Sequence, residues 1–281
     1  MTKIDGGEPT AFRGQKNYSW SGLAPIFRPG ERLVEHEHKM VRELISVHPQ
    51  EFQQDGTMFD RLVRMQHYGL PTRLLDVTLN PLVALFFAAQ DFSKEEEKDG
   101  TTTKTPMDGK VILYRVPEDR SKYYDSDTVS CLSNLANLHV RDKRAVQHVG
   151  LSEELEVFNE REEMKRLLHF IHLERPNFDP KINPITLYRP VFVRPKNNNR
   201  RIIAQAGAFI IYGLEAATGS GKPYPTTIRQ VAMRVRWDKK PEIREQLARL
   251  GIDASVLFPE LDKAAEIISL KYRKRDDLLD V

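Results

Sequence analysis

Cysteine, long apolar runs and net charge are all scarce in this chain of 281 residues. Its one cysteine, Cys131, excludes an intramolecular disulfide and a cysteine-based metal cluster. The longest uninterrupted apolar run, residues 82–89, is well short of the ~18 residues that a membrane-spanning helix needs. The first residues have no apolar core of the kind that a signal peptide carries. We therefore expect a cytoplasmic protein without a membrane partner.

The charges of the chain nearly cancel. It has 43 Lys+Arg against 40 Asp+Glu, a formal net charge of +3. This balance argues against bulk electrostatic binding to nucleic acid or a membrane surface, although a local basic patch remains compatible with it. The composition, 30% charged and 40% hydrophobic, is typical of folded proteins. At about 100–200 residues per domain, the length suggests one large or two modest domains.

Several common catalytic motifs are absent from the sequence. It contains no Walker A loop, no Gly-x-Gly-x-x-Gly, no Gly-x-Ser-x-Gly and no zinc-protease helix. Cys131 lies in an apolar helical pattern, which favours a buried inert thiol over a nucleophile. No second metal ligand at suitable spacing lies near His67, so we expect no metal site. These absences disfavour the common nucleotide-binding and hydrolase classes.

Apolar periodicity and turn residues predict a mixed set of helices and strands. Helices are predicted over 31–46, 58–68, 80–91, 127–140, 152–173, 241–250 and 254–270. Strands are predicted over 12–15, 110–116, 188–193, 201–204, 208–212 and 229–237, with an exposed polar loop over 93–109. Asn80 and Pro81 mark a helix start, because asparagine is a favoured N-cap and proline a favoured first helical residue. Because regular βαβ spacing is missing, we predict an α+β fold.

The densest polar segment is residues 66–81, interpreted as a loop held between two helices. Its donors and acceptors are Gln66, His67, Tyr68, Thr72, Arg73, Asp76 and Thr78. Such a loop is a good scaffold for a functional site. An equally simple alternative is structural, with Asp76 paired to Arg73 and with Thr78 or Asn80 capping the next helix. Likewise, His67 is either an acid or base or a hydrogen-bonded packing residue.

Two shorter segments are further candidates. In Phe12-Arg13-Gly14-Gln15, the arginine beside a glycine can reach a phosphate or carboxylate near uncrowded backbone. Gln205, within the predicted strands, is either a pocket-facing amide or, slightly favoured, a surface residue followed by a bulge at Gly207.

In this order, these segments resemble the FRG domain family, named for a Phe-Arg-Gly motif such as Phe12-Arg13-Gly14. The resemblance continues through Gln66–Asp76, Thr78, Asn80-Pro81 and 84–88, and it ends with Arg201-Ile202, Gln205, Gly207 and Phe209. It covers about residues 10–215. Val77 stands where an aromatic residue is expected.

A more distant likeness links residues 76–88 to the ADP-ribosyltransferase pattern, in which a Ser/Thr strand end precedes a helix carrying Ala and Phe-Ala. It implies a mixed or antiparallel sheet core, with Arg13, Thr78 and Gln205 at the three site positions. Arg13 is then expected to hold the phosphates of a dinucleotide, and Thr78 or Tyr68 to orient the nicotinamide ribose. A neutral Gln205 cannot stabilise an oxocarbenium charge, so either Asp76 or His67 takes that role or the activity is lost.

Together, the residues and the resemblance imply an FRG domain at 11–237 after a disordered stretch at 1–10, with a C-terminal helical extension at 238–281 packed on it. The expected ligand is a small nucleotide-like molecule, with NAD as the candidate substrate and no tightly bound cofactor. The alternative is a non-catalytic module that recognises a ligand or protein; a nucleic-acid target has the least support. The expected catalytic residues are Arg13, His67, Asp76 and Gln205, and the expected ligand-binding residues are Gln15, Gln66, Tyr68, Thr72, Arg73, Thr78 and Asn80.

Overall fold

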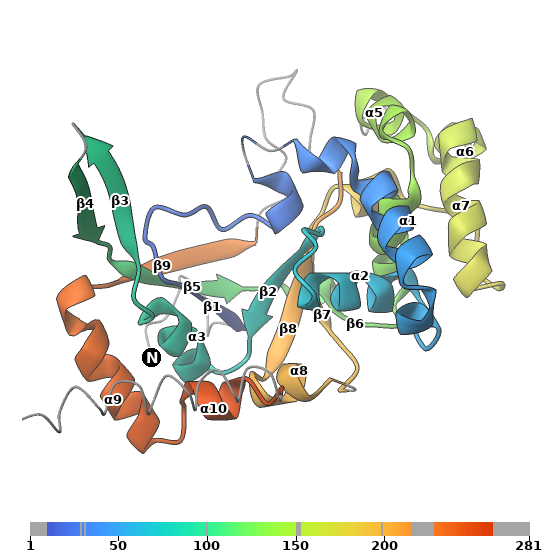
Figure 1. Cartoon of the computed structure of the whole chain (residues 1–281). Helices are drawn as coiled ribbons and strands as arrows, with labels where there is room; N and C mark the ends of the chain where they lie inside the picture. Colours follow the sequence, from blue (N-terminus) through green and yellow to red (C-terminus); the bar gives the residue numbers. More distant parts are fainter. Residues whose placement is uncertain are drawn as a thin grey trace, which may run out of the picture.

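A mainly antiparallel sheet forms the centre of the computed structural model, which describes residues 10–28, 30, 32–98, 101–149, 153–197, 199–214 and 228–260. Within these residues the sheet has seven strands in the order β6-β7-β8-β2-β1-β5-β9, and only the β6–β7 pair is parallel (Figure 1). The strands are β1 (Ala11–Gln15), β2 (Leu74–Thr78), β5 (Gly109–Arg115), β6 (Ser121–Tyr123), β7 (Val191–Arg194), β8 (Gly207–Ile211) and β9 (Arg229–Val235). The predicted mixture of helices with a largely antiparallel sheet is confirmed.

The sheet opens between its two central strands. β1 pairs with β5 along the whole length of β1, and β2 and β8 pair along their whole lengths. Between β1 and β2, the described residues pair at one position, Phe12 with Thr78. The two strands therefore separate on either side of this position. Arg13 spans the opening, and its Nη1 donates a hydrogen bond to the main-chain oxygen of Asp76 at 2.5 Å.

Helix α3 (Pro81–Ala88) packs directly against β1 near this opening. Its start follows the sequence prediction, because the Asn80 side chain accepts a hydrogen bond from Leu82 N at 2.9 Å and Pro81 occupies the first helical position. The contact with β1 is very close at Gly14. A Cβ atom there would lie 1.9 Å from the main-chain oxygen of Ala84, so only glycine fits.

The remaining helices form two groups in Figure 1. At one end of the sheet, α1 (Glu37–Val47), α2 (Met58–His67), α4 (Asp127–Asn134), α5 (Val140–Val149), α6 (Leu155–Glu160) and α7 (Glu162–Glu174) enclose the largest apolar core. The other group comprises α8 (Arg200–Ala204), α9 (Lys240–Arg249) and α10 (Ala254–Leu257). α9 and α10 pack on α3 through Leu247 and Leu257, which contact Val83 and Phe86 in a smaller core. None of the described helices combines the length and apolar character needed to cross a membrane.

Short 3₁₀ turns connect many of these elements. They span Pro25–Phe27, Leu33–Glu35, Pro49–Phe52, Glu118–Arg120, Leu135–Asn137, Pro184–Leu187 and Trp237–Lys239. The first predicted helix, 31–46, therefore begins as a 3₁₀ turn and becomes α-helical at Glu37.

Three sequence predictions of local structure are wrong. The segment 201–204 is helix α8 and not a strand, because Asn199 Oδ1 caps it by accepting a hydrogen bond from Arg201 N at 2.8 Å. The segment 66–81 is more than a loop, since Leu74–Thr78 forms the central strand β2. The segment 93–109 is exposed as expected, but its β3 (Ser93–Lys98) and β4 (Thr101–Pro106) pair as an antiparallel hairpin. The sequence did not predict this pairing, because the strands consist mainly of charged residues in β3 and of threonines in β4.

Two long predicted helices are divided. The helix expected over 127–140 ends at Asn134, and a 3₁₀ turn separates it from α5. The helix expected over 152–173 is interrupted at Arg161, whose extended backbone caps α7. The helix expected over 254–270 is described only as α10, and residues 261–281 lie outside the described residues, as do residues 1–9 of the expected disordered stretch.

Candidate functional site

A cavity of about 260 Å³ lies where the sheet opens between β1 and β2. Its walls come from β1, β2, β8, α2, α3 and the segment around α8. The lining residues are Arg13, Gly14, Val63, Gln66, His67, Asp76, Val77, Thr78, Phe87, Asn199, Arg201, Ile202, Gln205, Gly207, Ala208 and Phe209. The three polar segments that the sequence singled out therefore meet at one cavity.

Arg13 is a largely buried cation in the cavity wall, with 15% of its side chain exposed. Its Nη1 bonds to Asp76 O and lies 3.8 Å from Asp76 Oδ2. Its Nε is buried and has no hydrogen-bond partner among the described residues. A buried N–H without an acceptor is costly, so this donor is suited to an acceptor on a bound molecule.

Asp76 has an exposed carboxylate whose orientation is set by a hydrogen bond from a neighbouring side chain. Its side chain is 57% exposed, and Oδ2 accepts a hydrogen bond from Gln66 Nε2 at 2.9 Å. Gln66 is itself oriented, because its Oε1 accepts from Thr72 Oγ1 at 2.7 Å and its Nε2 also donates to Leu74 O. The chain from Thr72 through Gln66 to Asp76 thus sets the position of an accessible acceptor.

Thr78 and Gln205 join the ends of β2 and α8. Thr78 Oγ1 donates to the main-chain oxygen of Gln205 at 2.7 Å and accepts from Asn80 N at 3.0 Å. The Gln205 side chain donates from Nε2 to Leu257 O at 3.0 Å. Ala206, at φ 46°, turns the chain from α8 into β8. Thr78 and Gln205 line the cavity, and both also hold its walls together.

His67 ends helix α2 at the edge of the cavity, next to a carboxylate that the sequence analysis missed. Its Nε2 lies 3.7 Å from Glu260 Oε1. Both oxygens of Glu260 are buried and have no hydrogen-bond partner among the described residues. A second carboxylate, besides Asp76, therefore contacts the histidine of the cavity wall, although Glu260 itself does not line the cavity.

Five of the expected ligand-binding residues do not line the cavity: Gln15, Tyr68, Thr72, Arg73 and Asn80. Gln15 is buried and donates to Ser21 O, and Asn80 caps α3. Thr72 supports Gln66 from behind. Tyr68 lies at the end of α2 with its side chain turned to solvent. These residues shape the surroundings of the cavity and do not form its wall.

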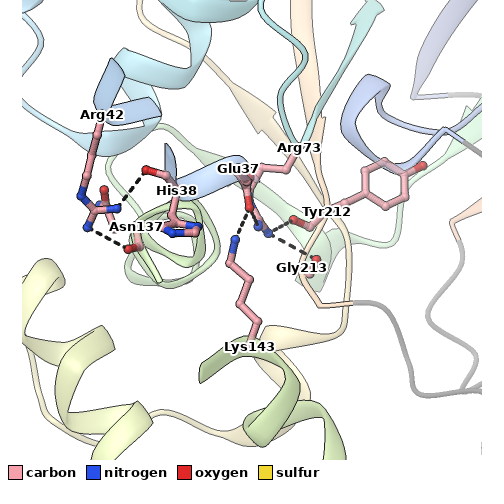
Figure 2. Close-up of polar contacts among 8 residues, drawn as sticks. All are labelled: Glu37, His38, Arg42, Arg73, Asn137, Lys143, Tyr212 and Gly213. Atoms are coloured by element: carbon pink, nitrogen blue, oxygen red, sulfur yellow. Dashed lines mark hydrogen bonds and ion pairs between the residues drawn. The ribbon is translucent and has the colours of Figure 1, made fainter. Parts of the chain in front are cut away.

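Arg73 is fully buried in a separate ionic cluster, shown in Figure 2. Its Nε and Nη2 donate to the two oxygens of Glu37 at 2.8 and 2.5 Å, and its Nη1 donates to Tyr212 O at 2.9 Å. Lys143 donates to Glu37 Oε2 at 2.5 Å. The suggested Arg73–Asp76 pair is therefore wrong: Asp76 contacts Arg13, and Arg73 joins β2 to α1 and α5.

The charges in this cluster do not cancel, because one carboxylate, Glu37, faces the two cations Arg73 and Lys143. Burial works to raise the pKa of Glu37, but the positive charges of Arg73 and Lys143 and their hydrogen bonds outweigh it and lower that pKa to about 2. Burial lowers the pKa of Lys143, and the charge of Glu37 opposes that shift. We infer an ionised carboxylate clamped between two cations.

Besides Glu260, the sequence analysis missed Asn199, Arg201 and Phe87 as residues of the site. Arg201 adds a second cation to the cavity wall, and its guanidinium lies 5.2 Å from the centre of the Phe258 ring. The sequence analysis predicted a strand over 201–204, and a strand orients the Arg201 side chain differently from the helix that forms there. The asparagine cap at Asn199 was the available signal for the helix.

Cys131 is buried in α4, and burial raises the pKa of its thiol to about 12, so it is protonated and unreactive as predicted. Within the described residues, no group of three or more His, Cys, Asp or Glu side chains is arranged to hold a metal ion.

Comparison with known proteins identifies the segment that carries most of this cavity. A family model described as the FRG domain matches residues 8–97, from the strand that holds Arg13 to the first strand of the hairpin. Neither a search of curated proteins nor a search of solved structures found a match. Gln205 and its surroundings lie outside the matched residues. The chain therefore carries an FRG domain, matched over residues 8–97.

Proposed function

We propose that the cavity between β1 and β2 binds a nucleotide-like ligand, with NAD as the candidate. The observation that carries this proposal is Arg13, whose buried Nε–H lacks an acceptor among the described residues. Arg201 supplies a second guanidinium in the same cavity. Guanidinium groups bind phosphate through charge-assisted hydrogen bonds. Because the net charge of the chain is small, the affinity for a phosphate must come from individual residues such as these.

The size of the cavity limits how much of the ligand it encloses. Its volume, about 260 Å³, is just below the ~300–1,000 Å³ typical of pockets for small molecules. It suits one half of a dinucleotide, with the phosphates at Arg13. In this proposal, the accessible carboxylate of Asp76 accepts hydrogen bonds from hydroxyl groups of the enclosed ribose.

The chemistry proposed for such a complex is cleavage of the N-glycosidic bond of NAD. The bond from ribose C1′ to the nicotinamide nitrogen breaks, and its electron pair leaves with nicotinamide, which loses its positive charge. Asp76 stabilises the positive charge that develops on the ribose. An oxygen nucleophile, water or a hydroxyl of a target molecule, then bonds to C1′, and His67, beside Glu260, takes its proton.

The same proposal includes an ADP-ribosyltransferase-like scaffold and a division of the chain into a domain and a C-terminal extension. The contacts of Arg13, Thr78 and Gln205 at one cavity support it, as these are the three positions that the likeness implies. The domain is proposed to span 11–237, with 238–281 as the helical extension. In support, α9 and α10 pack against α3 through a shared apolar core.

A non-catalytic recognition module is the second candidate. The neutral Gln205 side chain favours it, because its amide already donates to Leu257 O and adds no negative charge opposite Arg13. Such a module binds its ligand in the same cavity without releasing nicotinamide.

Calorimetric titration with NAD tests ligand binding, and an assay of nicotinamide release separates the two candidates. We expect NAD to bind the wild-type protein. Arg13→Ala should weaken that binding by about 1.5–3 kcal/mol, roughly 10- to 150-fold, because it removes hydrogen bonds between charged groups.

Arg249→Ala is the matched control. Arg249 is a surface arginine of α9, paired with Glu245 and 74% exposed, so its loss should leave the affinity for NAD unchanged. Absence of NAD binding by the wild-type protein contradicts the proposal. Binding without nicotinamide release, alone or with target proteins present, supports the recognition module instead.

A further inference from the structure

A second hollow, of about 130 Å³, adjoins the cavity and runs along α2. Val63, His67, Asn199 and Ile202 line both spaces, so the two spaces lie side by side. The hollow is therefore adjacent to the cavity on the side of His67. Its position matters because the cavity alone encloses only part of a dinucleotide.

The cations of the hollow are already neutralised. Arg64 forms two hydrogen bonds with Asp55, from Nε to Oδ2 at 2.7 Å and from Nη2 to Oδ1 at 2.9 Å. Lys196 Nζ donates to Asp60 Oδ2 at 3.0 Å. A phosphate gains little from cations that are bound to carboxylates. These walls suit an uncharged group with hydrogen-bonding edges.

Tyr68 provides a flat aromatic surface in the hollow. Its side chain lines the hollow and remains exposed, with a fractional exposure of 66% for the residue. It occupies the C-cap of α2, where Gly69 at φ 90° turns the chain away. The His67 ring packs edge-on against it, with ring centres 5.1 Å apart. A solvent-facing ring in a polar hollow is a suitable platform for stacking a nucleobase.

We propose that this hollow binds the second base of a dinucleotide, stacked on Tyr68. The inference rests on the proposed function, since it places one half of the ligand in the cavity and the other half past His67. The inference thereby assigns a place to the half of a dinucleotide such as NAD that the cavity does not enclose.

Comparison of NAD with nicotinamide mononucleotide tests the proposal by calorimetry. The mononucleotide lacks the second base, so the wild-type protein should bind NAD more tightly than the mononucleotide. Tyr68→Ala should weaken NAD binding about 5- to 150-fold, the equivalent of ~1–3 kcal/mol for a stacked base. The same variant should leave the affinity for the mononucleotide unchanged, and Tyr68→Phe should retain NAD binding because the ring remains.

Tyr123→Ala is the matched control, since Tyr123 is a 59% exposed tyrosine on β6 that lines neither space. Thermal unfolding of each variant verifies that it folds. If the wild-type protein binds neither ligand, both the proposed function and this inference fail. If it binds both equally, or if Tyr68→Ala weakens both or neither, the inference is overturned while the proposed function stands.

Discussion

Arg13 and Arg73 both belong to the polar motifs, yet their guanidinium groups meet different surroundings. Arg73 is 1% exposed and bonds to Glu37 and to main-chain oxygens, which leaves it no role at the cavity. Arg13 keeps a donor without an acceptor among the described residues. The guanidinium of Arg73 is thus committed to its cluster, whereas that of Arg13 retains one N–H donor for the ligand that we propose. Sequence alone does not separate them, because Glu37 and Lys143 lie far from Arg73 along the chain.

Replacement of Glu37 by glutamine should strongly destabilise the protein. The variant leaves the buried cations Arg73 and Lys143 facing each other without a compensating charge. Loss of one partner from a buried ionic group typically costs about 3–5 kcal/mol. Urea denaturation at pH 7 measures the change in the free energy of unfolding. Glu43→Gln, at an exposed position of the same helix, should have little effect.

The pH dependence of stability tests whether Glu37 is ionised in this cluster. The pKa of Glu37 is about 2 in the folded protein against an ordinary value of 4.5. Its contribution is therefore complete above pH 4.5 and is lost as the pH falls toward 2, because the unfolded chain binds the proton first. The wild-type protein should lose more stability than Glu37→Gln between pH 5 and pH 3. Equal losses would show that Glu37 is not ionised in the cluster.

At the scale of the elements, the contact between β1 and α3 determines one wall of the cavity. Gly14 allows α3 to approach β1 closely enough for the main-chain oxygen of Ala84 to occupy the place of a side chain. Arg13 and Phe87, which line the cavity, lie on these two elements. The glycine of the Phe-Arg-Gly motif thus has a packing role beside the ligand-binding role proposed for its arginine.

Replacement of Gly14 by alanine should therefore displace α3. The added Cβ would meet Ala84 O at 1.9 Å and Ala88 N at 2.8 Å, and main-chain atoms of a helix cannot yield locally. We expect destabilisation at or above the upper end of the ~1–3 kcal/mol typical of overpacking. Gly56→Ala is the control, since no atom lies within 4 Å of its Cβ position. Equal urea midpoints for the two variants would refute the packing role.

Local signals in the sequence predicted most elements but not those defined by distant partners. The helix start at Asn80 and Pro81 was predictable because cap and helix are adjacent in the chain. The strand Leu74–Thr78 was not, because its pairing partner, β8, lies more than 100 residues away, and its Asp76 broke the apolar pattern. Similarly, Arg13, Asp76 and Gln205 were predictable as candidates, whereas Glu260 and Arg201 depend on the folding of α8 and the segment after α10.

At the scale of the whole molecule, the order of the strands explains how the site forms. β8, β2 and β1 are neighbours in the sheet, although β1 and β2 lie within the residues that the FRG model matches and β8 lies outside them. The helices α4–α7, inserted between β2 and β8 in the sequence, pack with α2 in the largest core and so support the end of α2 that carries Gln66 and His67. The site is therefore a property of the complete sheet and not of any one motif.

Hydrogen–deuterium exchange with and without saturating NAD tests most directly whether these three segments form one nucleotide site. Binding should slow exchange together in 12–15, 66–80 and 199–209, because each contributes backbone to the walls of the same cavity. Exchange in α6 and α7, which line no part of it, should remain unchanged. Exchange that NAD leaves unaltered in all three segments, or slows only elsewhere, would contradict the account.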